Sequence, residues 1–226
     1  MNIEQNLREV RCRIEAACHR AGRQFSEVSI IAVTKTVGVQ EILELARCGQ
    51  TVFGENRIQD AQRKCEQLRE HPFQWHMIGH LQRNKVRHAL RIFSVIHSVD
   101  SEALAVEIEK EAAKSHRRMP VLIEVNVSGE ESKFGVVPAA VTPLARAIAA
   151  MEHVELDGLM TMAPIVDEAE KTRPVFRALR DVLLELRTLN LPGAPLRHLS
   201  MGMTQDFEVA VEEGATLVRV GTALFR

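Results

Sequence analysis

Val28-Ser29-Ile30-Ile31-Ala32-Val33-Thr34-Lys35 is the stretch that decides the fold. Its β-branched and nearly unbroken apolar run predicts a strand buried on both faces, as in a parallel sheet. A lysine has no place in such a core unless the carboxyl end of the strand opens into a site. Lys35 is therefore the first candidate for chemistry, because a buried lysine loses its proton easily and its neutral amine attacks carbonyls to form a Schiff base. The alternative is a lysine whose charged end reaches solvent at the strand end.

The composition is that of a globular protein that binds a small molecule. With 226 residues, 46% hydrophobic and 26% charged, the chain predicts one domain, residues 1–226, with a large core. Its formal net charge of −1 excludes the strong field typical of proteins that bind nucleic acid or anionic membranes. Residues 1–10 are polar and helical in pattern rather than signal-like, and no apolar run approaches membrane-spanning length, so we expect a cytoplasmic protein.

The cysteines favour reduced thiols over a disulfide framework or a zinc site. Cys12, Cys18, Cys48 and Cys65 show no CxxC spacing, and the helical patterns carry them. His76 and His80 are four residues apart, but on a strand and its following loop rather than on one helix face, which argues against a shared metal ion. We therefore expect no metal site.

Apolar runs of strand length alternate with helical patterns along the chain. A leading helix is predicted within residues 1–24, where Gly22 ends it. Strands are predicted at residues 28–35, 51–54, 74–79, 93–99, 121–126, 156–162, 198–201 and 216–221. Helices are predicted between them, at residues 39–48, 57–70, 81–90, 102–115, 138–151, 168–189 and 204–213. Eight β/α units without a linker predict an α/β fold, a single TIM (β/α)8 barrel with an extra N-terminal helix. A doubly wound open sheet is the alternative, but it usually has fewer strands at this length, and its G-x-G-x-x-G turn is absent.

In a TIM barrel the site lies at the carboxyl ends of the strands. The turns after the seventh and eighth predicted strands are small, contain glycine and run into helix starts, where exposed backbone N–H groups bind phosphate. TIM barrels most often bind phosphate at these two loops. Ser200 and Thr204 offer hydroxyl donors, and Gly202, Gly221 and Thr222 offer backbone N–H groups. Glycines that merely permit turns are the alternative interpretation.

A Schiff-base lysine after the first strand and a phosphate site after the last two describe a barrel that holds pyridoxal 5′-phosphate. Six segments carry a specific resemblance to a known family: Ala32-Val33-Thr34-Lys35, Phe53-Gly54-Glu55-Asn56, residues 75–85, Ser132-Lys133-Phe134-Gly135, residues 198–204 and residues 218–225. In these segments, and in their order over nearly the whole chain, the sequence resembles the pyridoxal phosphate homeostasis family.

This resemblance implies a barrel similar to the N-terminal domain of alanine racemase, with the cofactor bound covalently to Lys35 as an internal aldimine. It also implies a role in the intracellular homeostasis of pyridoxal phosphate and of amino and keto acids, without established catalytic turnover. By the same match Arg219 faces the pyridine nitrogen and Asn56 lines the pocket. The phosphate is then held by four residues of the last two turns: Ser200, Gly202, Gly221 and Thr222.

Residue chemistry argues against an enzyme but leaves alternatives open. Racemases of this kind need a second base on the opposite face of the substrate, in the alanine racemases a tyrosine from another domain, and this sequence contains no tyrosine. A guanidinium at Arg219 does not donate its proton to the pyridine nitrogen, so the ring is a poorer electron sink than a protonated pyridine ring. His76, His80 and His198 remain alternatives for the second base, which leaves a weak cofactor-dependent amino-acid racemase open.

A Schiff-base aldolase acting on a sugar phosphate is the third hypothesis. It is disfavoured because Glu55 is the only acid/base candidate near the lysine. The favoured hypothesis is a cofactor-binding protein that is not an enzyme, that binds neither nucleic acid nor membrane, and that makes at most transient contact with cofactor-dependent apo-enzymes. A monomer is expected, because alanine racemases dimerise through a second domain that this chain does not show.

Overall fold

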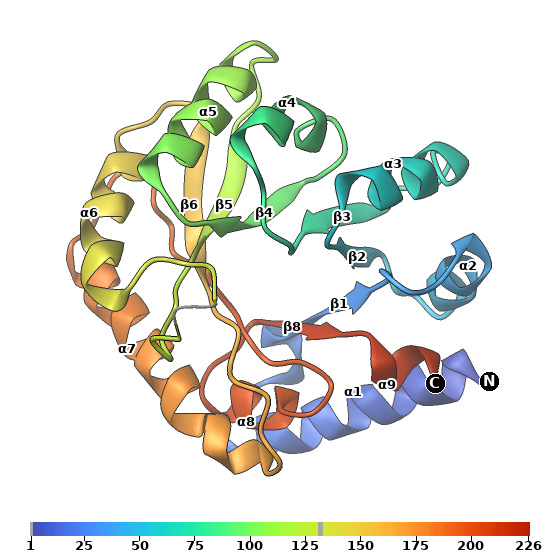
Figure 1. Cartoon of the computed structure of the whole chain (residues 1–226). Helices are drawn as coiled ribbons and strands as arrows, with labels where there is room; N and C mark the ends of the chain where they lie inside the picture. The colour runs from blue at the N-terminus through green and yellow to red at the C-terminus, as the bar shows by residue number, and fades with distance from the viewer. Residues whose placement is uncertain (1, 131–132) are drawn as a thin grey trace.

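The chain forms a closed β-barrel, here described from a computed structural model that covers residues 2–130 and 133–226. Within these residues eight parallel strands follow one another around the ring, and β8 pairs with β1 to close it (Figure 1). The strands are β1 Ser29–Val33, β2 Val52–Glu55, β3 Gln74–Met77, β4 Val95–Val99, β5 Met119–Glu124, β6 Val154–Met160, β7 His198–Ser200 and β8 Leu217–Val220. The predicted TIM barrel is confirmed.

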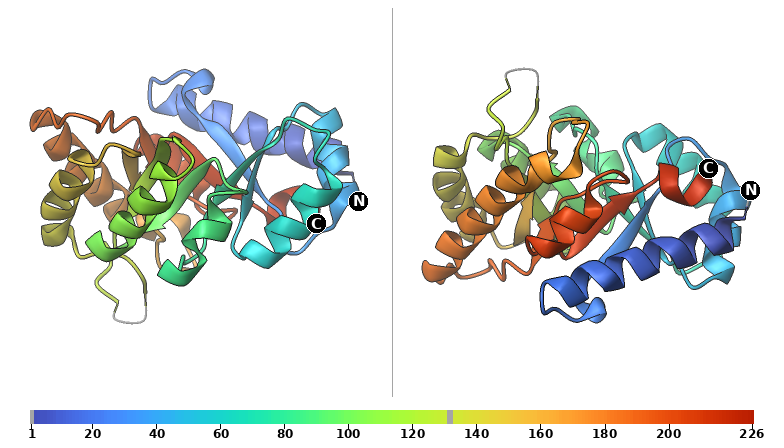
Figure 2. Two further views of the ribbon diagram at one scale, coloured as in Figure 1. Left: turned by 90° about the horizontal axis from the view of Figure 1, so that it is seen from above. Right: turned by 90° about the horizontal axis from the view of Figure 1, so that it is seen from below.

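Helices lie outside the ring and connect successive strands (Figure 2). Local signals place two of them well: the N–H of Leu104 donates to the capping hydroxyl of Ser101, and Pro138 occupies the first turn of α6. The α-helices are α1 Ile3–Arg20, α2 Val39–Arg47, α3 Ile58–Gln67, α4 Val86–Ala89, α5 Glu102–Ala113, α6 Pro138–Ala149, α7 Arg173–Thr188, α8 Phe207–Glu212 and α9 Thr222–Phe225, with 3₁₀ turns at Phe25–Glu27, Arg83–Lys85 and Ala169–Thr172. None of the described helices is long and apolar enough to cross a membrane.

Each of the seven helices predicted between strands is shorter in the structure, and two examples follow. The segment predicted as helix 81–90 is an α-helix only in α4, and the 3₁₀ turn Arg83–Lys85 precedes it. The segment predicted as helix 204–213 begins three residues late, at Phe207. There the Asp206 carboxylate accepts a hydrogen bond from the N–H of Met203 (2.6 Å) and holds the preceding residues in a turn.

The leading helix packs against the last helices of the barrel. One face of α1 is buried, and in Figure 1 the helix runs beside α8 and α9. The side-chain amide of Asn6 donates to the backbone oxygens of Leu224 (3.1 Å) and Arg226 (3.0 Å). These bonds tie the first helix to the end of the chain, next to the strand that closes the ring.

The inside of the barrel changes from apolar to polar along the strands. Ile31, Leu122, Met160 and Leu217 form a small buried cluster of their own. Side chains alternate along a strand, so residues two positions further on also point inward, one layer nearer the carboxyl end. On β5 and β8 these positions hold Glu124 and Arg219, both less than 10% exposed. The barrel interior therefore becomes charged toward the end where TIM barrels have their sites.

Candidate functional site at the carboxyl end of the barrel

Lys35 lies in the turn after β1, beside the turn that follows β8. The two strands are paired, and a Cβ built on Gly221 would lie 3.3 Å from the backbone oxygen of Val33. The Lys35 side chain is exposed, so the expectation of a buried lysine is wrong. The strand ends at Val33, and the turn carries Lys35 beyond the last inward-facing layer of the barrel. The core itself does not desolvate this amine.

A buried ion pair fixes the residue just before Lys35. Oε1 of Glu55 accepts hydrogen bonds from Oγ1 of Thr34 (2.7 Å) and from Nζ of Lys64 (2.5 Å). Nζ of Lys64 also donates to the backbone oxygen of Thr34 (2.7 Å). The Glu55 side chain is fully buried. Glu55, the acid/base candidate of the aldolase hypothesis, is thus engaged in holding the turn rather than in contact with the Lys35 amine.

The side chains of Ser200 and Arg219 are in contact inside the barrel. Nη1 of Arg219 donates to Oγ of Ser200 (2.6 Å), Nη2 donates to the backbone oxygen of Thr161 (2.8 Å), and the backbone N–H donates to the oxygen of Gly202 (3.0 Å). Burial lowers the pKa of Arg219 to about 10, while Glu124 and Asp206 oppose this shift. Arg219 therefore remains charged at neutral pH.

The turns after β7 and β8 present unpaired backbone donors. Among residues 2–130 and 133–226, nothing accepts a hydrogen bond from the N–H groups of Gly202, Gly221 or Thr222. Gly202 has a φ of +89°, and a Cβ there would lie only 2.6 Å from Cβ of Ala210. Three free N–H groups in the turns that follow the strands of Ser200 and Arg219 are donors of the kind that a phosphate group requires. The residues present therefore fit a phosphorylated ligand.

The remaining candidates lie nearer the rim. Thr222 is exposed, and the N–H of its neighbour Ala223 donates to Oγ1 of Thr204 (3.4 Å), which links the two turns. In this link the Thr204 oxygen accepts, so its own proton is still available, and the expected contact with phosphate stays a prediction. Asn56 is half-buried and lines a pocket of about 450 Å³ together with Met77 and His80.

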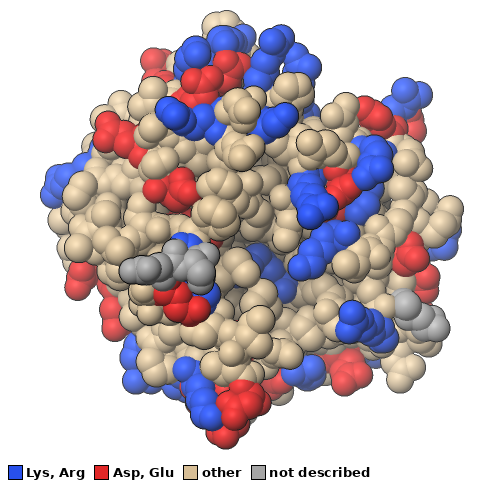
Figure 3. All heavy atoms as spheres, viewed as in Figure 1, with Lys and Arg blue, Asp and Glu red and all other residues tan. Residues whose placement is uncertain are grey.

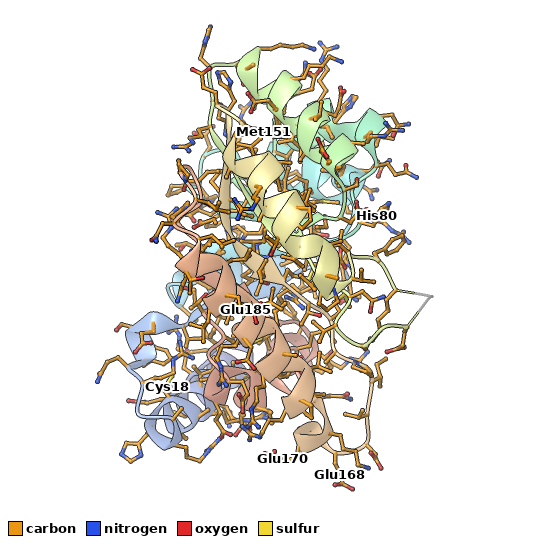
Figure 4. All side chains as sticks on the ribbon, turned by 90° about the vertical axis from the view of Figure 1, so that its left-hand side faces the viewer. Cys18, His80, Met151, Glu168, Glu170 and Glu185 are labelled. Carbon is orange, nitrogen blue, oxygen red and sulfur yellow. The ribbon has the colours of Figure 1, made fainter. Side chains whose placement is uncertain are left out.

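The carboxyl end of the barrel is the face seen in Figures 1 and 3. His80 follows β3, and in Figure 4 it is labelled at the right-hand edge, which corresponds to the front of Figure 1. Figure 3 shows this face hollowed near its middle, with basic side chains in the hollow and along one side of it. The ring of His80 stacks on that of Phe134, with 4.0 Å between the ring centroids.

Of the three histidines considered for a second base, only His80 reaches this face. His198 begins β7, and its Nδ1 pairs with Oγ1 of Thr216 (3.0 Å) at the amino end of the strand. His76 is inside the barrel, where its Nδ1 pairs with Nε2 of His97 (2.9 Å). In the described part of the chain, no group of three His, Cys, Asp or Glu side chains could hold a metal ion.

Sequence reasoning missed two buried polar residues, His97 and Glu124. Both lie within strands, whereas the candidate residues of a barrel site are expected after the strands. A signal was present, because a histidine and a carboxylate interrupt the otherwise apolar alternation of these strands. Burial, with the charge of Asp100, raises the pKa of Glu124 to about 7, and Arg219 opposes this shift.

Glu124 makes a testable contribution to the pH dependence of stability. Its folded pKa of about 7 lies above that of an unfolded glutamate, about 4.3. The folded state thus binds the extra proton, and the stability that this proton gives is present at low pH and lost as pH rises through 7. We expect the free energy of unfolding of Glu124→Gln, relative to that of the wild type, to rise by on the order of 2 kcal/mol between about pH 4.5 and about pH 7.5. Urea unfolding at both pH values measures this, and parallel pH profiles would contradict it.

Comparison with known proteins identifies the family. The family model of the alanine racemase N-terminal domain matches residues 3–226 of the sequence. A pyridoxal phosphate homeostasis protein from Aquifex aeolicus is 46% identical over 226 residues, covering 100% of this chain and 98% of the relative. This chain belongs to the pyridoxal phosphate homeostasis family. The same-named protein of Pseudomonas aeruginosa is 39% identical, covering 99% of this chain and 94% of its own length.

Solved structures support this family assignment. An unknown protein from Bifidobacterium adolescentis superposes with a TM-score of 0.92 at 38% identity, covering 99% of this chain and 94% of the other. PipY of Synechococcus elongatus, solved with pyridoxal phosphate (PLP) bound, has a TM-score of 0.87 at 35% identity and covers 99% and 100%. An alanine racemase of Clostridium difficile, at 15% identity and a TM-score of 0.73, shares the fold. The resemblance seen in the sequence is confirmed. Ser132, in the fourth of its segments, lies outside the described residues.

Proposed function

We propose that this protein binds pyridoxal 5′-phosphate covalently on Lys35 and serves the intracellular homeostasis of the cofactor and of amino and keto acids. The observation that carries the proposal is the free donor set, the N–H groups of Gly202, Gly221 and Thr222 beside Ser200. It lies at the end of β7 and β8, next to the turn that presents the Lys35 amine. The names of the curated relatives and the PLP-bound PipY structure support the same ligand.

Each residue has a distinct part in this proposal. The three N–H groups and the hydroxyl of Ser200 would bind the phosphate, and the amine of Lys35 would hold the cofactor through its aldehyde carbon, with release of the aldehyde oxygen as water. When bound, the cofactor supplies an electrophilic aldehyde and a ring that delocalises negative charge. Arg219 would face the ring nitrogen and keep its own proton, and Asn56 would line the pocket. Because Arg219 is charged at neutral pH, a ring nitrogen facing it would stay unprotonated, which would discourage carbanion chemistry.

The protein is therefore proposed to bind its cofactor without turning over amino acids. A weak racemase is the second candidate, favoured by the matching alanine racemase model and by His80 at the open face. The expectations of a monomer, of transient contact with apo-enzymes and of a cytoplasmic location remain predictions, which sizing of the purified protein, cofactor transfer assays and cell fractionation can test.

Borohydride reduction tests the assignment of Lys35. The protein is incubated with PLP, reduced, digested and mapped by mass spectrometry, and we expect the pyridoxyl group on the peptide that contains Lys35. Lys64 is an internal comparison, because its amine is held by Glu55 and Thr34 and is not free to react. Label found mainly on Lys64, Lys85 or Lys133 would refute the assignment.

A further inference from the structure

A chain of hydrogen bonds crosses the barrel interior from β3 to β8. Nδ1 of His76 lies 2.9 Å from Nε2 of His97, and Nδ1 of His97 lies 2.9 Å from Oγ of Ser200. Oγ of Ser200 accepts from Nη1 of Arg219 (2.6 Å). All four side chains are buried, and His97 and Ser200 are fully so. The two histidines therefore connect to the phosphate site through a single hydroxyl group.

Both histidines are neutral at physiological pH. Burial lowers the pKa of His76 to about 4, with a smaller contribution from His198. Burial also holds the pKa of His97 well below its usual value, and a proton on His76 or the charge of Arg219 lowers it further. A neutral imidazole carries one N–H and one lone pair, so each ring must donate on one side and accept on the other. The chain of bonds can thus run in only two directions.

The two directions differ in what Ser200 offers to a ligand. In one, Ser200 donates its only proton to Nδ1 of His97, Nε2 of His97 donates to His76, and Ser200 presents only a lone pair to the site. In the other, Nδ1–H of His76 donates to His97 and Nδ1–H of His97 donates to Ser200. The serine oxygen then accepts from both His97 and Arg219, and its own proton is free.

The far end of the chain permits either direction. Nε2 of His76 is buried and has no hydrogen-bond partner among the described residues. Nε2 of His76 is an unpaired donor in the first direction and an unpaired acceptor in the second. Since the described part of the chain offers it no partner in either case, hydrogen bonding at His76 does not select one direction. The choice must come from the other end, at Ser200. A phosphate dianion offers only acceptor oxygens, and a serine lone pair facing it would be repelled.

Resting on the proposed phosphate site, we infer that His97 and His76 are positioning residues, which as Nδ1–H tautomers free the Ser200 proton for the bound phosphate. They do not touch the ligand, and they act through the serine. This assigns a role to the two buried histidines that the site itself leaves unexplained. It also extends the phosphate site from β7 and β8 across the barrel to β3 and β4.

Histidine tautomers in the intact protein test the inference directly. The wild type, labelled with ¹⁵N-histidine, is saturated with inorganic phosphate or with PLP, and two-bond ¹H–¹⁵N spectra identify which ring nitrogen carries the proton. The nine histidines are resolved by comparison with His97→Asn and His76→Asn. We expect Nδ1–H on both rings. Nε2–H on His97 with phosphate bound would overturn the inference.

Two variants give a functional measurement with a built-in rescue. His97→Leu removes the donor to Ser200, and we expect PLP to bind about tenfold more weakly while pyridoxal, without the phosphate, is unaffected. His97→Asn places an amide N–H near the position of Nδ1 and should restore most of the affinity. Equal losses for PLP and pyridoxal would contradict the inference. If neither variant folds, the wild-type tautomers decide.

These results separate the inference from the proposal about Lys35. Inorganic phosphate has no aldehyde, so its effect on the tautomers does not depend on a covalent bond to the lysine. A wild type that shows Nδ1–H with phosphate but takes no label on Lys35 supports the histidine roles and refutes the covalent assignment. Label on Lys35 together with Nε2–H on His97 supports the covalent assignment and refutes the histidine roles.

Discussion

Lys35→Ala is expected to abolish covalent attachment of the cofactor while leaving the fold intact. Lys35 lies in an exposed turn after β1, so its truncation should change the free energy of unfolding by no more than about 0.5 kcal/mol. Its amine is the only part that the proposed covalent bond requires. The measurements are the mass of the borohydride-reduced protein, which should lack the pyridoxyl group, and a urea unfolding curve that matches the wild type.

A matched control separates the loss of this amine from a general loss of lysine. Lys85 is also exposed and belongs to the 3₁₀ turn after β3, and Lys85→Ala should retain the full label. Lys35→Ala should still bind PLP without a covalent bond, because the donors after β7 and β8 are untouched. Full label on Lys35→Ala, or equal loss in both variants, would refute the role of Lys35.

Gly202→Ala is expected to destabilise the barrel strongly. The residue has a φ of +89°, and a Cβ would lie 2.6 Å from Cβ of Ala210 and 2.9 Å from Cα of Phe207. The left-handed backbone conformation costs an L-residue about 1–2 kcal/mol, and overpacking adds about 1–3 kcal/mol. We expect a loss of about 3 kcal/mol in the free energy of unfolding, measured with urea.

Gly214→Ala is the matched control for this variant. Gly214 has a similar φ of +102°, but its Cβ would meet nothing closer than 3.5 Å, so only the conformational cost of about 1–2 kcal/mol applies. Where Gly202→Ala folds, the displaced turn should also weaken PLP binding more than Ser200→Ala does, because it moves backbone donors. Equal stability losses at the two glycines would contradict the close packing under the turn after β7.

The fold was predictable because its periodicity is strong. Strands such as β1 and β5 are apolar on both faces, and the helices between them carry clear amphipathic spacing. The proximity of the turns after β7 and β8 was also predictable, since a barrel brings the ends of these strands together wherever they are in the sequence. The family resemblance added Arg219 and Asn56, which spacing alone does not distinguish from ordinary strand-end residues.

What the sequence could not show depends on tertiary contacts. The exposure of Lys35 follows from where β1 ends, and a pattern fixes such boundaries only within a few residues. The bonds from His76 to His97 and from His97 to Ser200 join strands that are distant in the sequence, so no local spacing reports them. The ion pair between Lys64 and Glu55 is hidden for the same reason.

The central claim is that this barrel holds its cofactor without turning over amino acids, and the fate of the substrate α-proton tests it most directly. The sequence has no tyrosine, and Arg219 keeps its charge beside the proposed ring position. The PLP-loaded protein is incubated with each common L-amino acid in deuterium oxide, and the α-proton signal is followed by NMR. We expect the proton to be retained, while cofactor passes to an apo-enzyme added to the mixture. Exchange at roughly one per second or faster, a rate typical of enzymes, would contradict the account and favour the racemase.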